Sequence, residues 1–233
     1  SNLTGNQIFN ATESNAGQSV AGDVSLYYQK PFDLQGNDAT FAFGANISNI
    51  GAKISYTETI QKDFIPTNLR LGFGFETEID KYNTIGFMID FNKLLVPTPP
   101  IYLKNDSTGQ FERDATGEFI IEKGKNPNVG VVTGIFQSFS DAPYGLKEEI
   151  REISLGFGAE YWYQEQFAFR TGYFHEHATK GNRKYFTLGV GLKLNVFGID
   201  IAYLIPVEQQ NPLQNTLRFS LTFNFEQLSS ALN

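Results

Sequence analysis

The residues best suited to chemistry are His175, Glu176 and His177, which contain both histidines of the sequence. Imidazole and carboxylate groups bind zinc and transfer protons. In an extended strand, alternate side chains point to opposite faces, so the two histidines share one face and Glu176 lies on the other. The spacing specifies no further ligand, and the chain has no cysteine. We therefore interpret the cluster as a solvated strand end and expect no metal and no other cofactor.

A second group of candidates is a run of carboxylates: Glu148, Glu149, Glu152 and Glu160. Paired carboxylates can catalyse proton transfer, but they need a pocket around them. The segment 148–152 is explained more simply as a polar loop end that enters a strand. The sequence has no Gly-x-Ser-x-Gly elbow, no phosphate-binding loop and no His-Glu-x-x-His motif. We expect no enzymatic activity and no catalytic residues.

The predicted strands that must position these residues have the reverse of the polarity expected in a water-soluble sheet, with an apolar face that nothing covers. The segments 71–75, 155–159 and 188–192 each read Leu-Gly-x-Gly-x, with polar residues flanking them in the glycine register. Strand alternation places large apolar side chains on one face and glycine with charged groups on the other. The sequence offers no second layer to cover the apolar face. This pattern is typical of a membrane β-barrel, which turns its apolar face to lipid.

The composition agrees with a barrel and excludes other classes. Of 233 residues, 15% are aromatic, and the mean hydropathy is -0.26. The chain lacks the run of about 18 apolar residues that a membrane-spanning helix requires. A net charge of -7 without a basic stripe argues against nucleic-acid binding. Residues 1–5 do not resemble a signal peptide, so we expect any export signal to have been removed or to lie upstream.

The alternation predicts about nine strands, several of them long enough for a tilted crossing of a bilayer. The only helix candidates are short, at 129–139 and 146–151. The predicted strands are 18–30, 38–50, 66–79, 82–93, 150–163, 166–177, 183–195, 197–205 and 214–225.

The predicted connections alternate in length, as they do in outer-membrane barrels with short periplasmic turns and long external loops. The short turns are 79–81, 164–165 and 195–196, with a modest one at 31–37. The longer connections are 51–65, 94–149, 178–182 and 206–213. With the C-terminus in the periplasm, every longer connection lies outside.

Aromatic residues are expected to form two girdles at the membrane interfaces. The inner set is Tyr28, Tyr82, Tyr161, Trp162 and Tyr163, and the outer set is Tyr56, Tyr173, Tyr185 and Tyr203.

Seven ionic residues are expected to face the lumen, where they either pair with one another or line a path for a ligand or ion. The glycines beside them leave room for a plug, for other side chains or for a ligand. These residues are Arg70, Glu76, Glu160, Arg170, Lys193, Asp200 and Arg218.

The long connection 94–149 is the segment most suggestive of function, because about 55 residues is unusually long for a loop. It contains a charged, hairpin-like stretch at 114–125 and an apolar-aromatic stretch at 131–139. Outside a membrane, such a stretch requires a partner surface, or else it packs on its own barrel as a lid. The predicted partner-binding residues are Ile135, Phe136, Phe139, Pro143 and Tyr144.

Several phrases, in order along the chain, resemble the PorV family of outer-membrane components of the type IX secretion system of Bacteroidota. One is Asn-Ile-Ser-Asn-Ile-Gly-Ala-Lys-Ile-Ser-Tyr at 46–56. The others are at 65–72, 134–143, 160–163, 170–173 and 215–221.

The resemblance implies a FadL-like barrel of fourteen strands in the bacterial outer membrane. We therefore expect residues 1–233 to form a single barrel domain that lacks its N-terminal strands and plug, with 94–149 as a long extracellular loop. An odd strand count agrees, because single-chain bacterial barrels have even numbers.

The resemblance further implies a function in protein secretion. The expected partners are a large outer-membrane translocon barrel, cargo with C-terminal signal domains, a sortase-like attachment complex, and outer-membrane lipids or lipopolysaccharide. The expected role is to receive cargo and carry it to the attachment machinery. One alternative is a FadL-like transporter of hydrophobic small molecules. Another is a lipopolysaccharide-modifying hydrolase, which would need a nucleophile.

Overall fold

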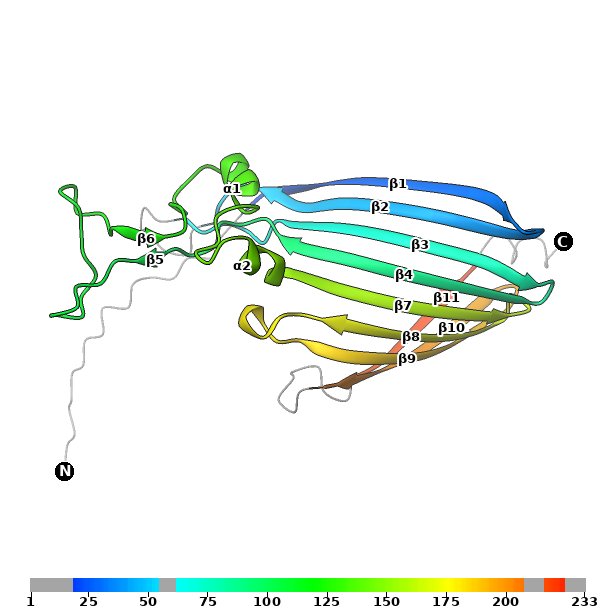
Figure 1. Cartoon of the computed structure of the whole chain (residues 1–233). Helices are drawn as coiled ribbons and strands as arrows, with labels where there is room; N and C mark the ends of the chain where they lie inside the picture. Colours follow the sequence, from blue (N-terminus) through cyan, green and yellow to red (C-terminus); the bar gives the residue numbers. More distant parts are fainter. Residues whose placement is uncertain (1–18, 55–61, 208–215, 225–233) are drawn as a thin grey trace, which may run out of the picture.

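The computed structural model describes residues 19–54, 62–207 and 216–224, and in this part nine strands form one antiparallel sheet in the order β1-β2-β3-β4-β7-β8-β9-β10-β11 (Figure 1). Neighbours in the sequence are also neighbours in the sheet. The strands are β1 (Ala21–Leu34), β2 (Asn37–Gly51), β3 (Asn68–Asp80), β4 (Asn83–Leu94), β7 (Ile153–Tyr163), β8 (Phe167–His175), β9 (Lys184–Lys193), β10 (Phe197–Pro206) and β11 (Leu217–Phe223). All nine predicted strands are confirmed, with ends that differ by a few residues.

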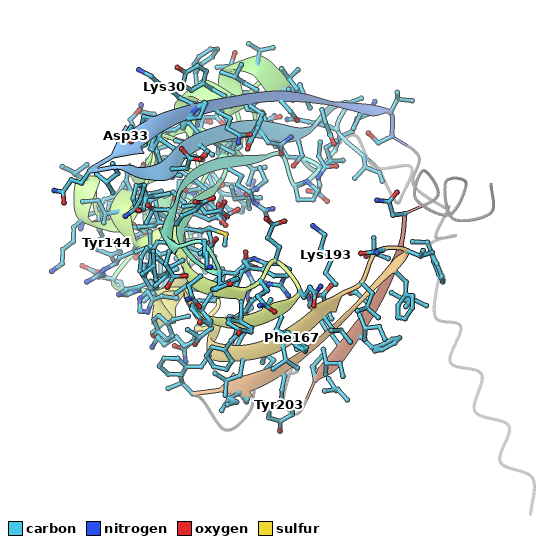
Figure 2. All side chains as sticks on the ribbon, turned by 90° about the vertical axis from the view of Figure 1, so that its right-hand side faces the viewer. Lys30, Asp33, Tyr144, Phe167, Lys193 and Tyr203 are labelled. Atoms are coloured by element: carbon cyan, nitrogen blue, oxygen red, sulfur yellow. The ribbon has the colours of Figure 1, made fainter. Side chains whose placement is uncertain are left out.

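The sheet curls into an open shell, seen end-on in Figure 2. Within the described residues, the edge strands β1 and β11 each pair with a single neighbour, so the shell does not close. A strongly curved antiparallel sheet of this kind is compatible with a β-barrel. The prediction of an all-β fold is confirmed.

The inverted polarity of the sequence is visible in the strand register. One continuous row of cross-strand partners on the convex face is Phe43, Phe73, Ile89, Phe157, Tyr173 and Phe186. These side chains are not covered, since Phe157 is 52% exposed and Phe186 is 49% exposed. In Figure 2, Phe167 and Tyr203 point away from the shell, whereas Lys193 points into it. The outward face is therefore apolar and the inner face polar.

The two ends of the sheet differ as the loop lengths predicted. Tight turns join the strands at one end, which we call the short-turn end, and the longer connections gather at the other, the long-loop end (Figure 1). The predicted turn at 31–37 is shorter than expected, because β1 continues through Pro31 and the chain reverses at Gln35 and Gly36. Within the described sheet β1 has a partner on one side only, and edge strands tolerate proline.

Most of the buried residues lie at the long-loop end. The largest fully buried side chains are Leu95, Thr67, Asp141 and Ser138. The connection from β4 to β7 holds most of the remaining elements, and both predicted helices are confirmed there. These elements are β5 (Ile101–Tyr102), β6 (Ile121–Lys123), α1 (Val131–Gln137) and α2 (Leu146–Arg151), and η1 (Ala178–Lys180) joins β8 to β9. Among the described residues, no helix is long and apolar enough to cross a membrane.

The aromatic girdles are partly as predicted. Tyr161 and Tyr163 lie opposite Phe169 and Phe167 on the outward face. Trp162, by contrast, is on the inner face, where its indole N–H donates to Glu160. Tyr185 also faces inward and stacks on Phe174 at 5.0 Å. The girdle prediction was wrong for Trp162 and Tyr185, because both occupy the polar register of their strands.

The outer-girdle candidate Tyr56 lies outside the described residues.

Neighbouring residues of β4 provide a test of the two faces. Ile89 lies in the outward row, whereas Met88 lines the inner wall. In a membrane, Ile89→Arg is expected to lower the free energy of unfolding by about 2–4 kcal/mol, because arginine would face the hydrocarbon. Met88→Arg is the matched control and is expected to cost less, since its charge would face Glu160 and Asp90. Denaturant titration in lipid vesicles measures both, and equal losses would contradict the assignment of faces.

Candidate partner-binding site at the long-loop end

The connection 95–152, which we call the rim loop, is fixed to the sheet by buried and partly buried ion pairs. Lys93, at the end of β4, contacts Glu149 at 3.0 Å and Glu152 at 2.7 Å. Lys180 of η1 contacts Glu148 at 2.8 Å and Glu152 at 2.9 Å. Glu152 is thus shared between a lysine at the end of β4 and a lysine of the β8–β9 connection. We call these five residues the rim clamp.

The position of Lys93 shows where the rim loop lies. Lys93 pairs with Ile153 and Leu69 in the outward row of the sheet, yet only 7% of its side chain is exposed. Its ammonium lies 6.0 Å from the centre of the Phe139 ring. The rim loop therefore folds over the outward edge of β4 instead of standing free in solvent.

A second buried group lies within the rim loop itself. Asp141 Oδ2 accepts hydrogen bonds from the Thr98 N–H at 3.1 Å and from Gln137 Nε2 at 3.4 Å. The N–H of Ala142 donates to Glu149 at 2.9 Å, which connects this group to the rim clamp. Asp141 Oδ1 has no hydrogen-bond partner among the described residues. Asp141 is consequently a buried carboxylate that is only half satisfied.

Their surroundings shift the pKa values of two rim carboxylates, Asp141 and Glu152, in opposite directions. Burial raises the pKa of Asp141, and its hydrogen bonds with Thr98 and Gln137 only partly offset this. Burial also acts to raise the pKa of Glu152, but hydrogen bonds from Lys93 and Lys180 outweigh it and hold the pKa below its ordinary value. Glu152 therefore stays charged and paired at neutral pH, whereas ionisation of Asp141 opposes its burial.

Helix α1 is placed by a close approach at Gly134. A Cβ built there would lie 2.6 Å from the Phe64 ring and 3.2 Å from Pro97. The absence of a side chain thus lets α1 pack directly on the connection between β2 and β3. The opposite side of the helix presents apolar residues to the surroundings, including Phe136, which is 72% exposed.

The predicted partner-binding residues differ in exposure. Phe136, Phe139 and Tyr144 are exposed, whereas Ile135 and Pro143 are half-buried. The ring of Tyr144, which points away from the shell in Figure 2, lies 5.6 Å from the Lys123 ammonium. The predicted set omits three further exposed apolar residues of α1 and α2, Val132, Leu146 and Ile150. Their spacing in two short helices is the signal that could have identified them.

The predicted hairpin is longer than 114–125. It begins with β5 and β6, continues through bridges between Lys104 and Phe111 and between Arg113 and Phe119, and extends away from the sheet in Figure 1. Tyr102 and the two phenylalanines form a cluster with ring centres 5.4–6.1 Å apart. The hairpin is therefore held by aromatic contacts along one side.

The inner wall carries the predicted ionic residues. Arg170 of β8 bonds Glu160 on the neighbouring strand β7 and reaches across β9 to bond Asp200 on β10. Its guanidinium lies 5.1 Å from the Trp162 ring. Arg70 donates to Asn92 at 2.8 Å. Mutual pairing is therefore the main role of Arg170. Two inner clefts adjoin this network, of about 420 and 360 Å³, and both are lined by Trp162 and Lys193.

The histidine cluster behaves as a strand end. His175 occupies the outward row opposite Lys184, whereas Glu176 turns inward and binds Arg183 at 2.7 Å. His177 caps η1 by accepting from the Thr179 N–H. Among the described residues, no group of three or more potential ligands is arranged to hold a metal ion. The carboxylates at 148, 149 and 152 are engaged by lysines of the rim clamp.

An antiparallel sheet with an apolar outward face, a polar inner face and long connections at one end is the architecture of membrane β-barrels, with which this open shell is compatible. A family model described as type IX secretion system protein PorV matches residues 3–101. The resemblance inferred from the sequence is confirmed over these residues, and it implies a role in type IX secretion. No curated protein matches the chain.

The rim clamp can be tested by removing its central cation. Lys93→Met would leave Glu149 and part of Glu152 buried without a counter-ion, which costs about 3–5 kcal/mol in comparable pairs. We expect proteases to cut the rim loop much faster in this variant. The control is Lys104→Met, at an exposed hairpin position, which should leave the cleavage rate unchanged. Unchanged cleavage of the Lys93 variant would show that the loop does not depend on these ion pairs.

The raised pKa of Asp141 predicts that its contribution to the stability of the rim loop is lost as pH rises. The lowered pKa of Glu152 predicts the opposite, a contribution that is lost as pH falls. Because the folded-state pKa of Asp141 is raised, the stability that its protonated form contributes is present below its ordinary pKa near 4 and is lost as pH rises through the raised value. Asp141→Asn should therefore protect the rim loop from proteolysis more at pH 8 than at pH 5, relative to the unmodified protein at each pH. Asp106→Asn, in an exposed turn, is the control. A protection ratio independent of pH would contradict the prediction.

Proposed function

We propose that this protein is a non-enzymatic subunit of the type IX secretion system that binds the outer-membrane translocon and receives secreted cargo bearing C-terminal signal domains. It then carries this cargo to the cell-surface attachment machinery, which includes a sortase-like protease. The family match supports the secretion role. The finer steps of binding and transfer are our inference from the rim loop.

The observation that carries this proposal is the set of apolar side chains that the rim loop exposes. Phe136, Phe139 and Tyr144 are 72%, 48% and 67% exposed. Aromatic residues held in place on a surface are characteristic of binding hot spots. Because Lys93 anchors the rim loop over the outward edge of the sheet, these residues are accessible to a partner beside the sheet as well as to one beyond its long-loop end. A second barrel lying beside this one in the membrane is a partner that such a surface would suit.

We further propose that the nine strands are the later part of a fourteen-stranded barrel in the bacterial outer membrane, with residues 1–233 in a single barrel domain. Within the described residues, β1 and β11 are the edge strands of the sheet, and this supports the proposal, because sheet edges are costly in lipid and further strands would close them. The connection 94–149 then lies outside the cell.

The inner wall favours the secretion subunit over a transporter of hydrophobic molecules. The larger inner cleft is bordered by Arg170, Lys193 and Asp200, and the adjoining one by Glu76 and Glu78. A carrier of apolar molecules needs a mostly apolar pocket with few polar groups. A wall of paired charges suits a lumen that is filled by protein or water.

Paired substitutions in the rim loop test the proposal. Phe136→Ser with Tyr144→Ser should reduce co-purification of the translocon and surface display of cargo at least about tenfold, because apolar hot spots contribute 2 kcal/mol or more. The matched control is Ile79→Ser with Tyr82→Ser, which alters two exposed apolar residues at the short-turn end, away from the rim loop, and should leave co-purification and display unchanged. Wild-type co-purification and display in the first variant would overturn the assignment of this surface.

A further inference from the structure

Helix α2 of the rim loop divides its side chains into three sides. Residues four apart lie on the same side of a helix, because one turn takes about 3.6 residues. Leu146 and Ile150 form an apolar side and are 76% and 60% exposed. Lys147 and Arg151 form a basic side next to it. The third side is acidic and consists of Glu148, Glu149 and the C-cap Glu152.

The acidic side of α2 is turned into the rim clamp, where its charge is already paired. All three glutamates bind Lys93 or Lys180 there. Among the described residues, no ion pair engages Lys147 or Arg151. The surface that α2 presents away from the clamp is therefore apolar and basic.

α2 lies on the outward side of the sheet, beside the ends of β4 and β7 (Figure 1). Its clamp partner Lys93 belongs to the outward row of β4 and is covered by the rim loop. The helix ends two residues before β7 begins and contacts that strand. The outward residues Leu155 and Phe157 of β7 are 38% and 52% exposed. The exposed apolar side of α2 thus adjoins the apolar outward face of the sheet.

The outward aromatic residues indicate the level at which α2 lies. Phe157 shares one outward row with Tyr173 and Phe186, whose ring centres are 4.8 Å apart. Aromatic side chains gather where the hydrocarbon of a bilayer meets its headgroups. Because α2 lies beyond this row toward the long-loop end, its level is that of the headgroups.

We propose that α2 docks on the membrane leaflet at the long-loop end. Its apolar side inserts at the boundary between headgroups and acyl chains, and its basic side binds anionic headgroups. Helices that lie in a membrane surface combine an apolar side with basic residues in this way. A helix of six residues is not stable alone in water, and the rim clamp supplies the support that it needs.

A lipid surface fits this part of α2 better than a protein partner does. The buried centres of protein interfaces are depleted in lysine, whereas Lys147 lies directly beside the apolar pair. Anionic lipids attract basic residues at the edge of a bilayer. The same bilayer would cover Leu146 and Ile150, whose exposure to water is otherwise unfavourable.

This inference rests on the outward face lying in a membrane, which the proposed function shares, but it requires neither the translocon nor cargo. The proposed protein contact uses Phe136, Phe139 and Tyr144. The membrane contact uses the exposed sides of α2, so the two proposals can fail separately.

The experiment measures how deeply residue 146 lies in a bilayer. The 233 residues contain no cysteine, so Leu146→Cys introduces a single attachment point among them for a nitroxide spin label. The full-length protein is placed in vesicles that mix phosphatidylcholine with phosphatidylglycerol. The depth of the label follows from its collisions with oxygen, which concentrates in hydrocarbon, and with an uncharged nickel chelate, which stays in water.

Two reference positions calibrate the depth. Phe157→Cys labels the outward face, and Ser107→Cys labels an exposed turn of the hairpin. The ratio of oxygen to nickel collisions at residue 146 should exceed that at residue 107 about fivefold or more, since an interfacial helix buries its apolar side about 5–10 Å into the headgroup boundary. Equal ratios at residues 146 and 107 would overturn the proposal.

The basic side is tested with the same label. Lys147→Gln with Arg151→Gln should lower the ratio at residue 146 about twofold or more, because each cation near an anionic surface adds several-fold to the attraction. Lys147→Arg with Arg151→Lys keeps both charges and should retain the ratio. The ratio at residue 157 should stay the same in both variants, which shows that the sheet is intact. An unchanged ratio at residue 146 in the glutamine variant would overturn the assignment to anionic lipid.

Two further outcomes separate this inference from the proposed function. A label at residue 146 that stays in water in vesicles, and is protected only when the translocon co-purifies, would assign this surface to a protein partner and overturn the inference alone. A label at residue 157 that also lies in water would show that the outward face is not in a bilayer. In that case both the inference and the proposed barrel would be wrong.

Discussion

Strand pairing is the interaction on which the rest of this structure depends, because the sheet has no second layer to support it. Each interior strand is bonded to a neighbour on both sides, and the alternation of side chains then fixes which groups face outward. In water, an uncovered row such as Phe73, Ile89 and Phe157 would be a severe liability. In lipid the same row contacts the hydrocarbon favourably, and the polar groups of the backbone are hydrogen-bonded within the sheet. The inverted polarity and the pairing thus require one another.

The inner glycines follow from the same constraint. Asp90 lies in register between Gly72 and Gly156, and a Cβ at Gly72 would approach its carboxylate to 2.7 Å. A Cβ at Gly191 would similarly meet Asp200 at 2.6 Å and Arg170 at 2.7 Å. These glycines leave space for charged side chains along the wall, and at Gly191 this space lets Arg170 of β8 reach across β9 to Asp200 of β10. The Leu-Gly-x-Gly pattern therefore has two causes. Its apolar residues form the exposed outward face, and its glycines leave space for ionic side chains on the inner face.

The sequence predicts well whatever depends on local alternation, and poorly whatever depends on distant contacts. The nine strands and the two short helices are local features, and they were predicted close to their observed bounds. Trp162 and Tyr185 depart from the girdle prediction because strand register, and not residue type, decides which face of the sheet a side chain occupies. The rim clamp could not be predicted, since Lys93 meets carboxylates 56 and 59 residues later in the chain. Nothing in the local pattern distinguishes those glutamates from solvated ones.

Glu152 shows how these distant contacts give the rim a defined shape. Its carboxylate accepts hydrogen bonds from Lys93, Lys180 and the Thr98 hydroxyl, which belong to the end of β4, to η1 and to the start of the rim loop. The end of β4, the β8–β9 connection and the start of the rim loop are thus tied to one largely buried carboxylate immediately before β7. A loop of this length would otherwise lose much of any binding energy to ordering. Fixing it in advance leaves the exposed aromatics of the rim loop available to a partner at a lower entropic cost, which is why a buried polar cluster and an exposed apolar surface occur together in the same loop.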